Sequence, residues 1–235
     1  MKKAVITGGA RGDGIGWATA VAMVAAGYDV LVTGLSEGEV AAAPAHDGIT
    51  ATVLDVRDDA AVNALFGRFD RLDALVNCAG AADPTTEYSI EGFARVVDIN
   101  LNGTLRCCLA ARDRLAAAKG AIVNVGSLYS TFGSAGTPAY SSSKGGVVQL
   151  TKSLALAWAP DIRVNAVAPG WIETGMARPV FENKEWADVI MGRLPMGRFG
   201  APEDLADPIV FLCSPAARYV NGVLLPVDGG YTCHG

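Results

Sequence analysis

The chain has 235 residues, of which 51% are hydrophobic and 18% charged, and its formal net charge at pH 7 is -5. This length suits one α/β domain with a large core, while the acidic balance and the lack of a basic run argue against a nucleic-acid partner. No apolar run reaches the roughly 18 residues that a membrane span needs, so no membrane partner is expected.

The first expected elements form a βαβ unit. A strand over 3–7 leads into a Gly-rich segment over 8–16, a helix over about 17–26 and a second strand over 29–33. Glycines let a backbone approach a pyrophosphate, and the helix N-terminus offers free N–H groups to it. Strand, Gly-rich turn and helix in this order therefore indicate a dinucleotide site.

The alternation of strands and helices continues to the end of the chain. Further strands are expected over 52–54, 74–76, 121–125, 162–167 and 223–227. The expected helices cover one or two turns between 34 and 55, about 58–69, about 91–118 with an interruption at Asn100 and Gly103, about 140–158, and a segment from about 202. Seven apolar strands that mostly lack period-two polarity predict a parallel sheet with helices on both faces. The expected fold is a doubly wound, Rossmann-like α/β domain that spans 1–235.

The cysteines are interpreted as reduced, mostly buried thiols of a cytoplasmic protein. Several lie in apolar segments and none has the spacing of a metal site, so no metal is expected: Cys78, Cys107, Cys108, Cys213 and Cys233. The N-terminus enters a strand directly, without a signal-peptide core. His46 and His234 are too few for a histidine-based site, which disfavours a zinc enzyme or a Ser-His-Asp hydrolase.

Ser127, Tyr140 and Lys144 carry the chemical signal. Ser127 follows the strand over 121–125, and Tyr140 and Lys144 lie four residues apart, which places them on one helix face. A nearby ammonium favours the ionised form of a phenol, whose pKa is otherwise about 10. Tyr140 is therefore a candidate acid or base, with Ser127 bonded to the same substrate oxygen. Tyr-x-x-x-Lys alone is common by chance, and the serine before it strengthens the pattern.

In this order and spacing, the motifs resemble those of the short-chain dehydrogenase/reductase family over nearly the whole chain. They are Thr7-Gly8…Gly14-Ile15-Gly16, Asp55-Val56, Asn77-Cys78-Ala79-Gly80, Asn100, Ser127, Tyr140-x-x-x-Lys144, Pro169-Gly170…Thr174, residues 195–204 and Asp228-Gly229-Gly230. The resemblance implies hydride transfer between a nicotinamide cofactor and a carbonyl or alcohol carbon. Tyr140 would donate or remove the proton, and Ser127 would position the oxygen. Lys144 would lower the pKa of Tyr140 and hold the nicotinamide ribose, and Asn100 would hold a water that links Lys144 to solvent.

The resemblance also implies a set of cofactor-binding residues. Asp55 and Val56 would flank the adenine, and Ile172 and Thr174 would contact the nicotinamide amide. The full set is Gly8, Arg11, Gly14, Ile15, Gly16, Ser36, Asp55, Val56, Asn77, Ala79, Gly80, Tyr140, Lys144, Pro169, Gly170, Ile172 and Thr174.

Two departures from the family pattern bear on the cofactor. The Gly-rich loop is two residues longer than usual, and Asp13 within it is expected to face solvent or pair with Arg11. At the second strand's end, Gly34-Leu35-Ser36 has neither the acidic residue that favours NAD nor the Arg that favours NADP. Arg11 favours NADP, whereas Glu37 and Glu39 favour NAD. The balance leans to NADP over NAD.

A mostly apolar and aromatic substrate wall is expected, with a substrate loop over about 171–200. Phe132 and Met176 fit either this wall or the core. Phe181, Trp186 and Met191 resemble one face of a lid helix, and packing on the domain is an equal alternative for them. The wall would consist of Ser127, Leu128, Tyr129, Phe132, Trp171, Met176 and further residues of the segment 175–193. A hydrophobic ketone, a 3-oxoacyl thioester or a cyclic diol would fit it.

The resemblance further implies a homotetramer, or a homodimer, formed through the Asn100 helix, the Tyr140 helix and the last strand. The apolar interface surface would come from residues 107–110 and from Val147, Val148 and Leu150. Two alternatives to a carbonyl reductase or alcohol dehydrogenase stay open. One is a nicotinamide-sensing regulatory protein without turnover, and the other is an enoyl reductase, which the spacing of Ser127 and Tyr140 disfavours.

Overall fold

The protein is built around one parallel sheet. The computed structural model describes residues 1–233, so His234 lies outside the described residues. Within these residues seven strands pair in the order β3-β2-β1-β4-β5-β6-β7. The strands are β1 (Lys2–Thr7), β2 (Tyr28–Gly34), β3 (Ile49–Val53), β4 (Ala74–Asn77), β5 (Ala121–Val125), β6 (Arg163–Pro169) and β7 (Leu224–Val227). The predicted doubly wound, Rossmann-like fold is confirmed. The strand order reverses between β1 and β4, and ligands of such sheets bind beyond the carboxyl ends of the strands at this point.

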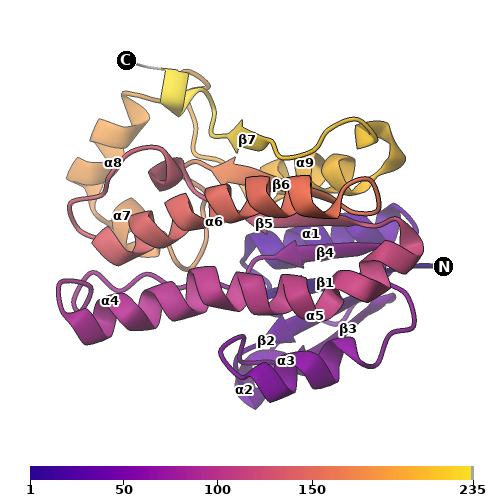
Figure 1. Cartoon of the computed structure of the whole chain (residues 1–235). Helices are drawn as coiled ribbons and strands as arrows, with labels where there is room; N and C mark the ends of the chain where they lie inside the picture. The colour runs from indigo at the N-terminus through magenta and orange to yellow at the C-terminus, as the bar shows by residue number, and fades with distance from the viewer. Residues whose placement is uncertain (234–235) are drawn as a thin grey trace.

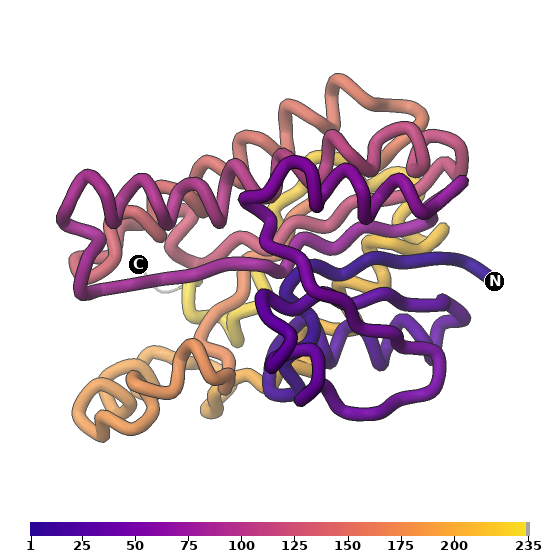
Figure 2. Tube along the Cα trace, turned by 90° about the horizontal axis from the view of Figure 1, so that it is seen from below, coloured from indigo at the N-terminus to yellow at the C-terminus, as the bar shows by residue number. Residues whose placement is uncertain are grey.

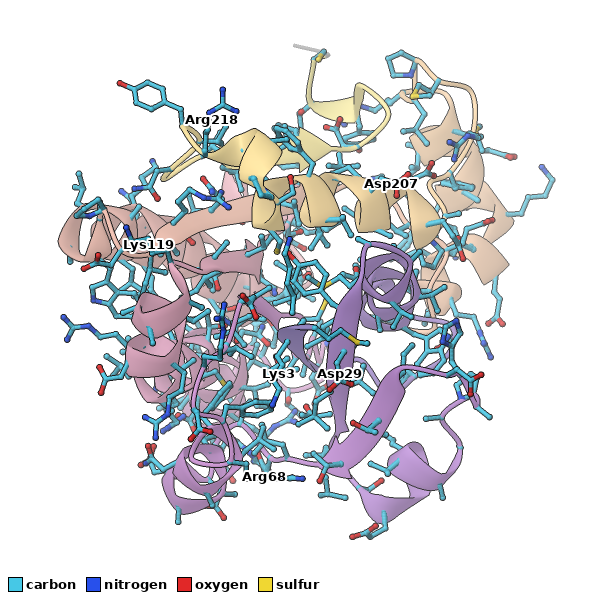
Figure 3. The ribbon with its side chains drawn as sticks, turned by 90° about the vertical axis from the view of Figure 1, so that its right-hand side faces the viewer. Lys3, Asp29, Arg68, Lys119, Asp207 and Arg218 are labelled. Atoms are coloured by element: carbon cyan, nitrogen blue, oxygen red, sulfur yellow. The ribbon has the colours of Figure 1, made fainter. Side chains whose placement is uncertain are left out.

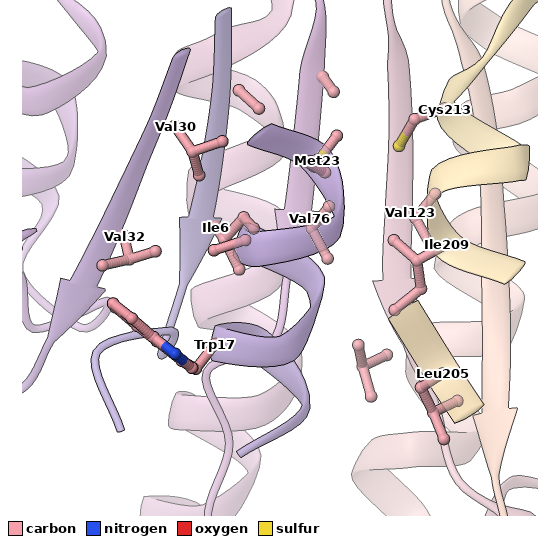
Figure 4. Packing of buried hydrophobic residues seen from close by; sticks show 14 of the residues in the cluster. Ile6, Trp17, Met23, Val30, Val32, Val76, Val123, Leu205, Ile209 and Cys213 are labelled. Atoms are coloured by element: carbon pink, nitrogen blue, oxygen red, sulfur yellow. The ribbon is translucent and has the colours of Figure 1, made fainter. Parts of the chain in front are cut away.

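Helices cover both faces of the sheet (Figure 1). One layer contains α1 (Ile15–Ala25) and α9 (Glu203–Cys213), and the other contains α3 (Asp59–Phe66), α5 (Gly103–Ala118) and α6 (Pro138–Trp158). In Figure 4, Trp17 and Met23 of α1 and Leu205 and Ile209 of α9 lie over the strand residues Ile6, Val30, Val32, Val76 and Val123. The short helix α2 (Glu37–Ala41) has the one or two turns that were predicted between 34 and 55.

The predicted interruption of the long helix at Asn100 is present. Helix α4 (Ile90–Val97) passes into a π-helical turn, Asp98–Asn102, before α5 begins at Gly103. The Thr104 hydroxyl, in the first turn of α5, donates to the carbonyl of Asn100 in the π-helical turn over 2.7 Å. Such single π turns inside α-helices are frequent at functional sites.

The segment over 171–200 differs from the single lid helix that was expected. It contains two short helices, α7 (Arg178–Glu182) and α8 (Lys184–Met191), because Asn183 leaves the helical conformation and caps α8 through the Trp186 N–H. Phe181 stacks on Phe199 with ring centroids 4.7 Å apart, whereas Trp186 is 60% exposed. The prediction that Phe181, Trp186 and Met191 share one helix face is therefore wrong, whereas the alternative of packing on the domain holds for Met191, which packs against the buried cluster that contains Leu128, Leu194 and Tyr231.

This segment is closed at its base. The Gly200 N–H donates to the Trp171 carbonyl over 2.9 Å, and the Glu173 N–H donates to the Gly200 carbonyl over 2.8 Å. Figure 2 shows the sheet between the two helix layers, with α7 and α8 projecting from the body at one end. Short 3-10 turns occur at Leu128–Ser130, Pro215–Ala217 and Tyr231–Cys233.

The two ends of the sheet differ in their side chains. Figure 3 turns the end where the strands begin toward the viewer, and Lys3 of β1 and Asp29 of β2 lie there, with Arg68 beside them. The predicted catalytic residues lie at the opposite end, where the strands finish. Among residues 1–233, no helix is long and apolar enough to cross a membrane.

The apolar residues assigned to a subunit interface are mostly in the chain's own core. Cys107 and Cys108 have no exposed surface, and Val147 and Val148 are 1% and 8% exposed. These four residues lie on the inward-facing sides of α5 and α6. The prediction that they supply interface surface is therefore wrong. Leu109 of α5 is 55% exposed. The homotetramer itself stays a prediction.

Candidate active site

Ser127, Tyr140 and Lys144 meet beyond the carboxyl end of β5. Ser127 comes two residues after this strand and begins the 3-10 turn Leu128–Ser130, where the Tyr129 N–H donates to its hydroxyl over 3.1 Å. Lys144 lies one turn after Tyr140 on α6, with its Nζ 5.6 Å from the centroid of the tyrosine ring. The Lys144 ammonium donates to the Val125 carbonyl over 2.7 Å. Strand end and helix thus hold the three groups together.

Burial shifts the pKa values of both ionisable groups. It raises the pKa of the Tyr140 phenol above its usual range, while the hydrogen bond with Ser127 acts in the opposite direction. Burial also lowers the pKa of Lys144 to about 8. The pKa of Tyr140 is thus raised, whereas the sequence predicted that Lys144 would lower it. The reason is that removing the phenolate from water outweighs the contacts that favour the ionised form.

Asn100 fastens the loop after β4 to the catalytic helix. Its side-chain oxygen accepts from the Ala81 N–H over 2.8 Å, and its amide donates to the Ala81 carbonyl over 2.9 Å and to the Ser143 hydroxyl over 3.0 Å. A Cβ on Gly80 would lie 3.3 Å from the Asn100 oxygen and 3.5 Å from Lys144 Nζ. The amide of Asn100 is thus engaged by protein groups, and its contact with a water stays a prediction.

A buried carboxylate that the sequence analysis missed, Glu87, accepts a hydrogen bond from the backbone of Tyr140. Glu87 is 1% exposed, and its two oxygens accept from the Tyr140 N–H (2.9 Å) and the Asp83 N–H (2.8 Å). The first N–H groups of a helix lack partners within the helix, and an anion there is favourable. Glu87 therefore fixes the first turn of α6. An acidic residue in a loop gives no sequence signal for this contact.

The Gly-rich loop has the geometry that a dinucleotide requires. Gly8 has a φ of +66°, and a Cβ there would lie 2.7 Å from the Ala79 Cα. The N-cap of α1 is Gly14, with no side-chain cap and no acidic residue in the first turn, so its N–H groups face a ligand without competition. Ile15 and Gly16 begin this helix. The residues present therefore fit a pyrophosphate.

Other predicted cofactor residues have protein partners that define their positions. Asp13 pairs with Arg11 over 3.5 Å, as expected, and is also 3.8 Å from Arg178 of α7. The Ser36 hydroxyl caps α2 by accepting from the Glu39 N–H. The Arg57 guanidinium, bonded to Asp55 over 2.6 Å, lowers the pKa of that carboxyl.

Three of the predicted cofactor-binding residues have side chains that point into the interior of the protein. The Asn77 amide donates to Asn124 over 2.8 Å inside the sheet–helix layer, although its neighbours Ala79 and Gly80 line the site. Val56 and Ile172 are both 5% exposed and pack in the two main cores.

The strand end at Pro169 and Gly170 is set by close packing. A Cβ on Gly170 would lie 2.6 Å from the Asp228 Cα, so the terminal Asp-Gly-Gly motif packs directly against this turn. Thr174 follows within the closed segment and is half-buried.

An aromatic cluster beside Tyr140 contains three of the residues predicted for the substrate wall, whose contact with a substrate stays a prediction. Tyr129 makes edge-to-face contacts with Phe132, Tyr140 and Trp171, at centroid distances of 5.9, 6.5 and 6.1 Å. Leu128 is buried behind them. Phe132 and Met176 are 41% and 54% exposed, which excludes the alternative that they are core residues.

Within residues 1–233, no group of three or more His, Cys, Asp and Glu residues could hold a metal ion. Burial raises the pKa of the Cys78 thiol, in the strand-end motif beside the site, to about 12, so this cysteine is protonated and unreactive at neutral pH.

Known proteins share this architecture over their full length. The family model described as "Enoyl-(Acyl carrier protein) reductase" matches residues 8–232. A cis-4-hydroxycyclohexanecarboxylate dehydrogenase from Sinomonas cyclohexanicum is 41% identical over 97% of this chain and 96% of its own. The chain belongs to the short-chain dehydrogenase/reductase family.

Two further members of this family are similar to the chain. A galactitol 2-dehydrogenase from Rhizobium johnstonii is 37% identical, over 99% of this chain and 95% of its own. The crystal structure of a gluconate 5-dehydrogenase from Burkholderia cenocepacia, in complex with NADP and tartrate, covers 100% of this chain and 96% of its own, with a TM-score of 0.90 and 30% identity. Short-chain dehydrogenases/reductases use NAD or NADP, and the protein is an NAD(P)-dependent enzyme of this family.

Proposed function

We propose that the protein interconverts a ketone and a secondary alcohol, with Tyr140 as the proton donor and acceptor. The observation that carries this proposal is the meeting of Ser127, Tyr140 and Lys144 beyond the end of β5. The names of the similar enzymes support it, since they describe dehydrogenases of a hydroxycyclohexanecarboxylate and of galactitol.

When bound, the nicotinamide supplies or takes up the hydride. In the reductive direction the Tyr140 hydroxyl donates its proton to the carbonyl oxygen, and in the oxidative direction the phenolate removes the proton from the alcohol. The Ser127 hydroxyl donates a hydrogen bond to the same oxygen and stabilises the charge that develops there. Lys144, with its pKa near 8, is mostly cationic at neutral pH and stabilises the phenolate.

The phosphates and ribose of the cofactor would be held by the chain's loops. Gly8 and Gly14–Gly16 would face the pyrophosphate, and Lys144 would reach the nicotinamide ribose. Asp55 and the backbone of Val56 would flank the adenine, and Thr174 would contact the nicotinamide amide. The structure of a relative with NADP supports a dinucleotide in this place.

We infer that the substrate is a small or medium-sized apolar ketone or alcohol, including cyclic ones. Tyr129, Phe132 and Trp171 present aromatic surface next to Tyr140, and Met176 is exposed in the neighbouring segment. This surface suits a ring or a short chain better than a phosphate or a sugar acid.

Enoyl reduction is the second candidate, because the matching family model carries that description. The position of Ser127 beside the Tyr140 phenol favours carbonyl chemistry, since both hydroxyls can then reach one oxygen. A nicotinamide sensor without turnover would not need Ser127, Tyr140 and Lys144 together. A cytoplasmic homotetramer or homodimer completes the proposal, with the exposed Leu109 and Leu156 on the outer faces of α5 and α6 available to an interface.

The proposal is tested by turnover of the wild type and Tyr140→Phe with a panel of ketones and with an enoyl thioester. The wild type should reduce ketones, and Tyr140→Phe should lose kcat by at least about 100-fold with cofactor affinity retained. Phe keeps the ring and removes only the hydroxyl. Nearly full activity in Tyr140→Phe, or turnover of the enoyl thioester alone, would contradict it.

A further inference from the structure

The end of β2 lacks a side chain where this fold usually presents an acidic residue to the adenosine ribose. Gly34 is the last residue of β2 and is buried. A Cβ built on Gly34 would lie 3.0 Å from the Ala10 Cβ, 3.1 Å from the Glu39 Cβ and 3.3 Å from Glu39 Oε2. The Glu39 carboxylate thus lies in the space that a side chain at position 34 would enter.

Two hydrogen bonds hold Glu39 in this place. Its Oε2 accepts from the Leu35 N–H over 2.7 Å, and its own N–H donates to the Ser36 hydroxyl over 3.2 Å. The bond accepted by Ser36 is the N-cap contact of α2, and the bond to Glu39 Oε2 comes from the residue before the N-cap. The carboxylate is therefore held in one orientation before any ligand binds, and an ionised carboxylate has further acceptor sites beyond the one that Leu35 uses.

A cavity of about 320 Å³ adjoins Glu39 between the Gly-rich loop and α2. Its lining consists of Ala10, Arg11, Gly12, Asp13, Gly38, Glu39 and Ala42. The loop residues in this lining directly precede the free N-terminus of α1, where a pyrophosphate fits. The cavity is therefore the neighbouring place for the adenosine ribose.

Among the residues that line this cavity, the charges of Arg11 and Asp13 pair with each other, whereas no cation within residues 1–233 is paired with Glu39. Asp13 pairs with Arg11, and the Arg11 guanidinium lies so close to Gly175 that a Cβ there would clash with Nη2. Arg178 is also within 3.8 Å of Asp13. Glu39, in contrast, is bonded through its carboxylate to the neutral Leu35 N–H.

We propose that Glu39, delivered from α2, is the residue that selects NAD(H) over NADP(H), in place of the side chain missing at Gly34. The inference rests on the proposed function, because it assumes a dinucleotide on the Gly-rich loop. A free carboxylate oxygen accepts from a ribose hydroxyl, whereas a 2′-phosphate carries up to two negative charges and is repelled. This assignment reverses the preference for NADP that Arg11 suggested.

The test titrates the purified protein, without substrate, with NADH and with NADPH, following the fluorescence of the reduced nicotinamide. The wild type should bind NADH at least about tenfold more tightly than NADPH. Glu39→Gln keeps the size and an acceptor for the Leu35 N–H, and it should reduce this ratio at least about fivefold, mainly through tighter binding of NADPH. Glu39→Ala should reduce the ratio to a similar extent.

Glu37→Gln is the matched control, because it removes the same charge from the same exposed helix turn. Its ratio should stay within about twofold of the wild type, since exposed charges without direct contact are screened. An equal change in Glu37→Gln and Glu39→Gln would overturn the proposal. So would a loss of discrimination in Glu39→Ala alone, which would make the helix cap, and not the charge, responsible.

The result also separates this inference from the proposed function. A wild type that prefers NADPH refutes the role of Glu39 and leaves the oxidoreductase intact. A wild type that binds neither nucleotide refutes the proposed function and, with it, this inference.

Discussion

Replacing Glu87 by Ala should weaken both the fold and the catalytic helix. The buried carboxylate accepts from two backbone N–H groups, those of Tyr140 and Asp83. A hydrogen bond to a charged group contributes about 1.5–3 kcal/mol, so the loss of both should lower the free energy of unfolding by about 3–5 kcal/mol. For a chain of this length each kcal/mol shifts the Tm by about 2–4 °C, and a fall of about 10 °C is expected.

The same change should also lower kcat. Tyr140 is the third residue of α6, and its N–H is one of those that Glu87 holds. When the helix start loosens, the phenol no longer keeps a fixed position relative to Ser127, so kcat should fall by about tenfold or more with a smaller change in KM. Glu87→Gln retains one oxygen acceptor and should show about half of the loss in unfolding free energy.

Chemical unfolding and steady-state kinetics of Glu87→Ala, Glu87→Gln and Glu91→Ala measure these effects. Glu91 is an exposed acidic residue in the first turn of α4 and serves as the control, with an expected change below about 0.5 kcal/mol. A loss below about 1 kcal/mol in Glu87→Ala would refute the reasoning, because it would mean that the two N–H groups find equivalent partners without the carboxylate.

Three further predictions concern the cofactor loop, the lysine and the substrate segment. Gly8→Ala should abolish binding of both NADH and NADPH in a fluorescence titration, because the positive φ and the 2.7 Å approach of Ala79 leave no room for a methyl group; unchanged binding would contradict this. Burial lowers the pKa of Lys144 to about 8, so with rising pH the folded state loses this proton before the unfolded state does. The free energy of unfolding of the wild type, relative to that of Lys144→Met, should therefore rise between about pH 8 and pH 10.5, by up to about 3 kcal/mol in urea unfolding. A difference that does not change with pH would show that the lysine keeps its ordinary pKa. Asp204→Asn removes a carboxylate that is bonded to Arg198 over 2.6 and 2.8 Å and to the Ala201 N–H. The change should lower the free energy of unfolding by about 1 kcal/mol and speed proteolysis within 171–200, with Asp207→Asn as the control. Equal digestion rates in the two variants would show that the Arg198–Asp204 pair does not anchor the segment.

The sheet and the meeting of Ser127, Tyr140 and Lys144 were predictable because their signals are local. Strands with continuous apolar residues, glycine punctuation and the four-residue spacing of Tyr140 and Lys144 depend on neighbours in the chain. The interruption at Asn100 was predictable for the same reason, since a polar amide stands within an otherwise apolar helix face. Order and type of elements therefore followed from short-range patterns.

The residues that the sequence analysis missed or misplaced depend on contacts between distant segments. Glu87 reaches Tyr140 across 53 positions, and no local pattern marks it. The outward direction of Cys107 and Val147 was misjudged because an apolar residue reads alike whether it faces the sheet or a partner subunit. Glu39 was recognised as an acidic neighbour, but only the fold shows its carboxylate at the end of β2.

The segment between Glu173 and Phe199 leaves and rejoins the body at nearly one point, because Trp171 and Glu173 pair with Gly200. A segment closed at its base in this way can change in length and sequence with little effect on the sheet, since doubling the length of a loop adds only about 0.6 kcal/mol to the entropic cost of closing it. The exposed Met176 of the predicted substrate wall lies in this segment, whereas Tyr129, Phe132 and Trp171 lie outside it. Exchanging residues 173–199 for those of a relative should therefore change the substrate preference on the Met176 side and leave the aromatic side of the wall unchanged.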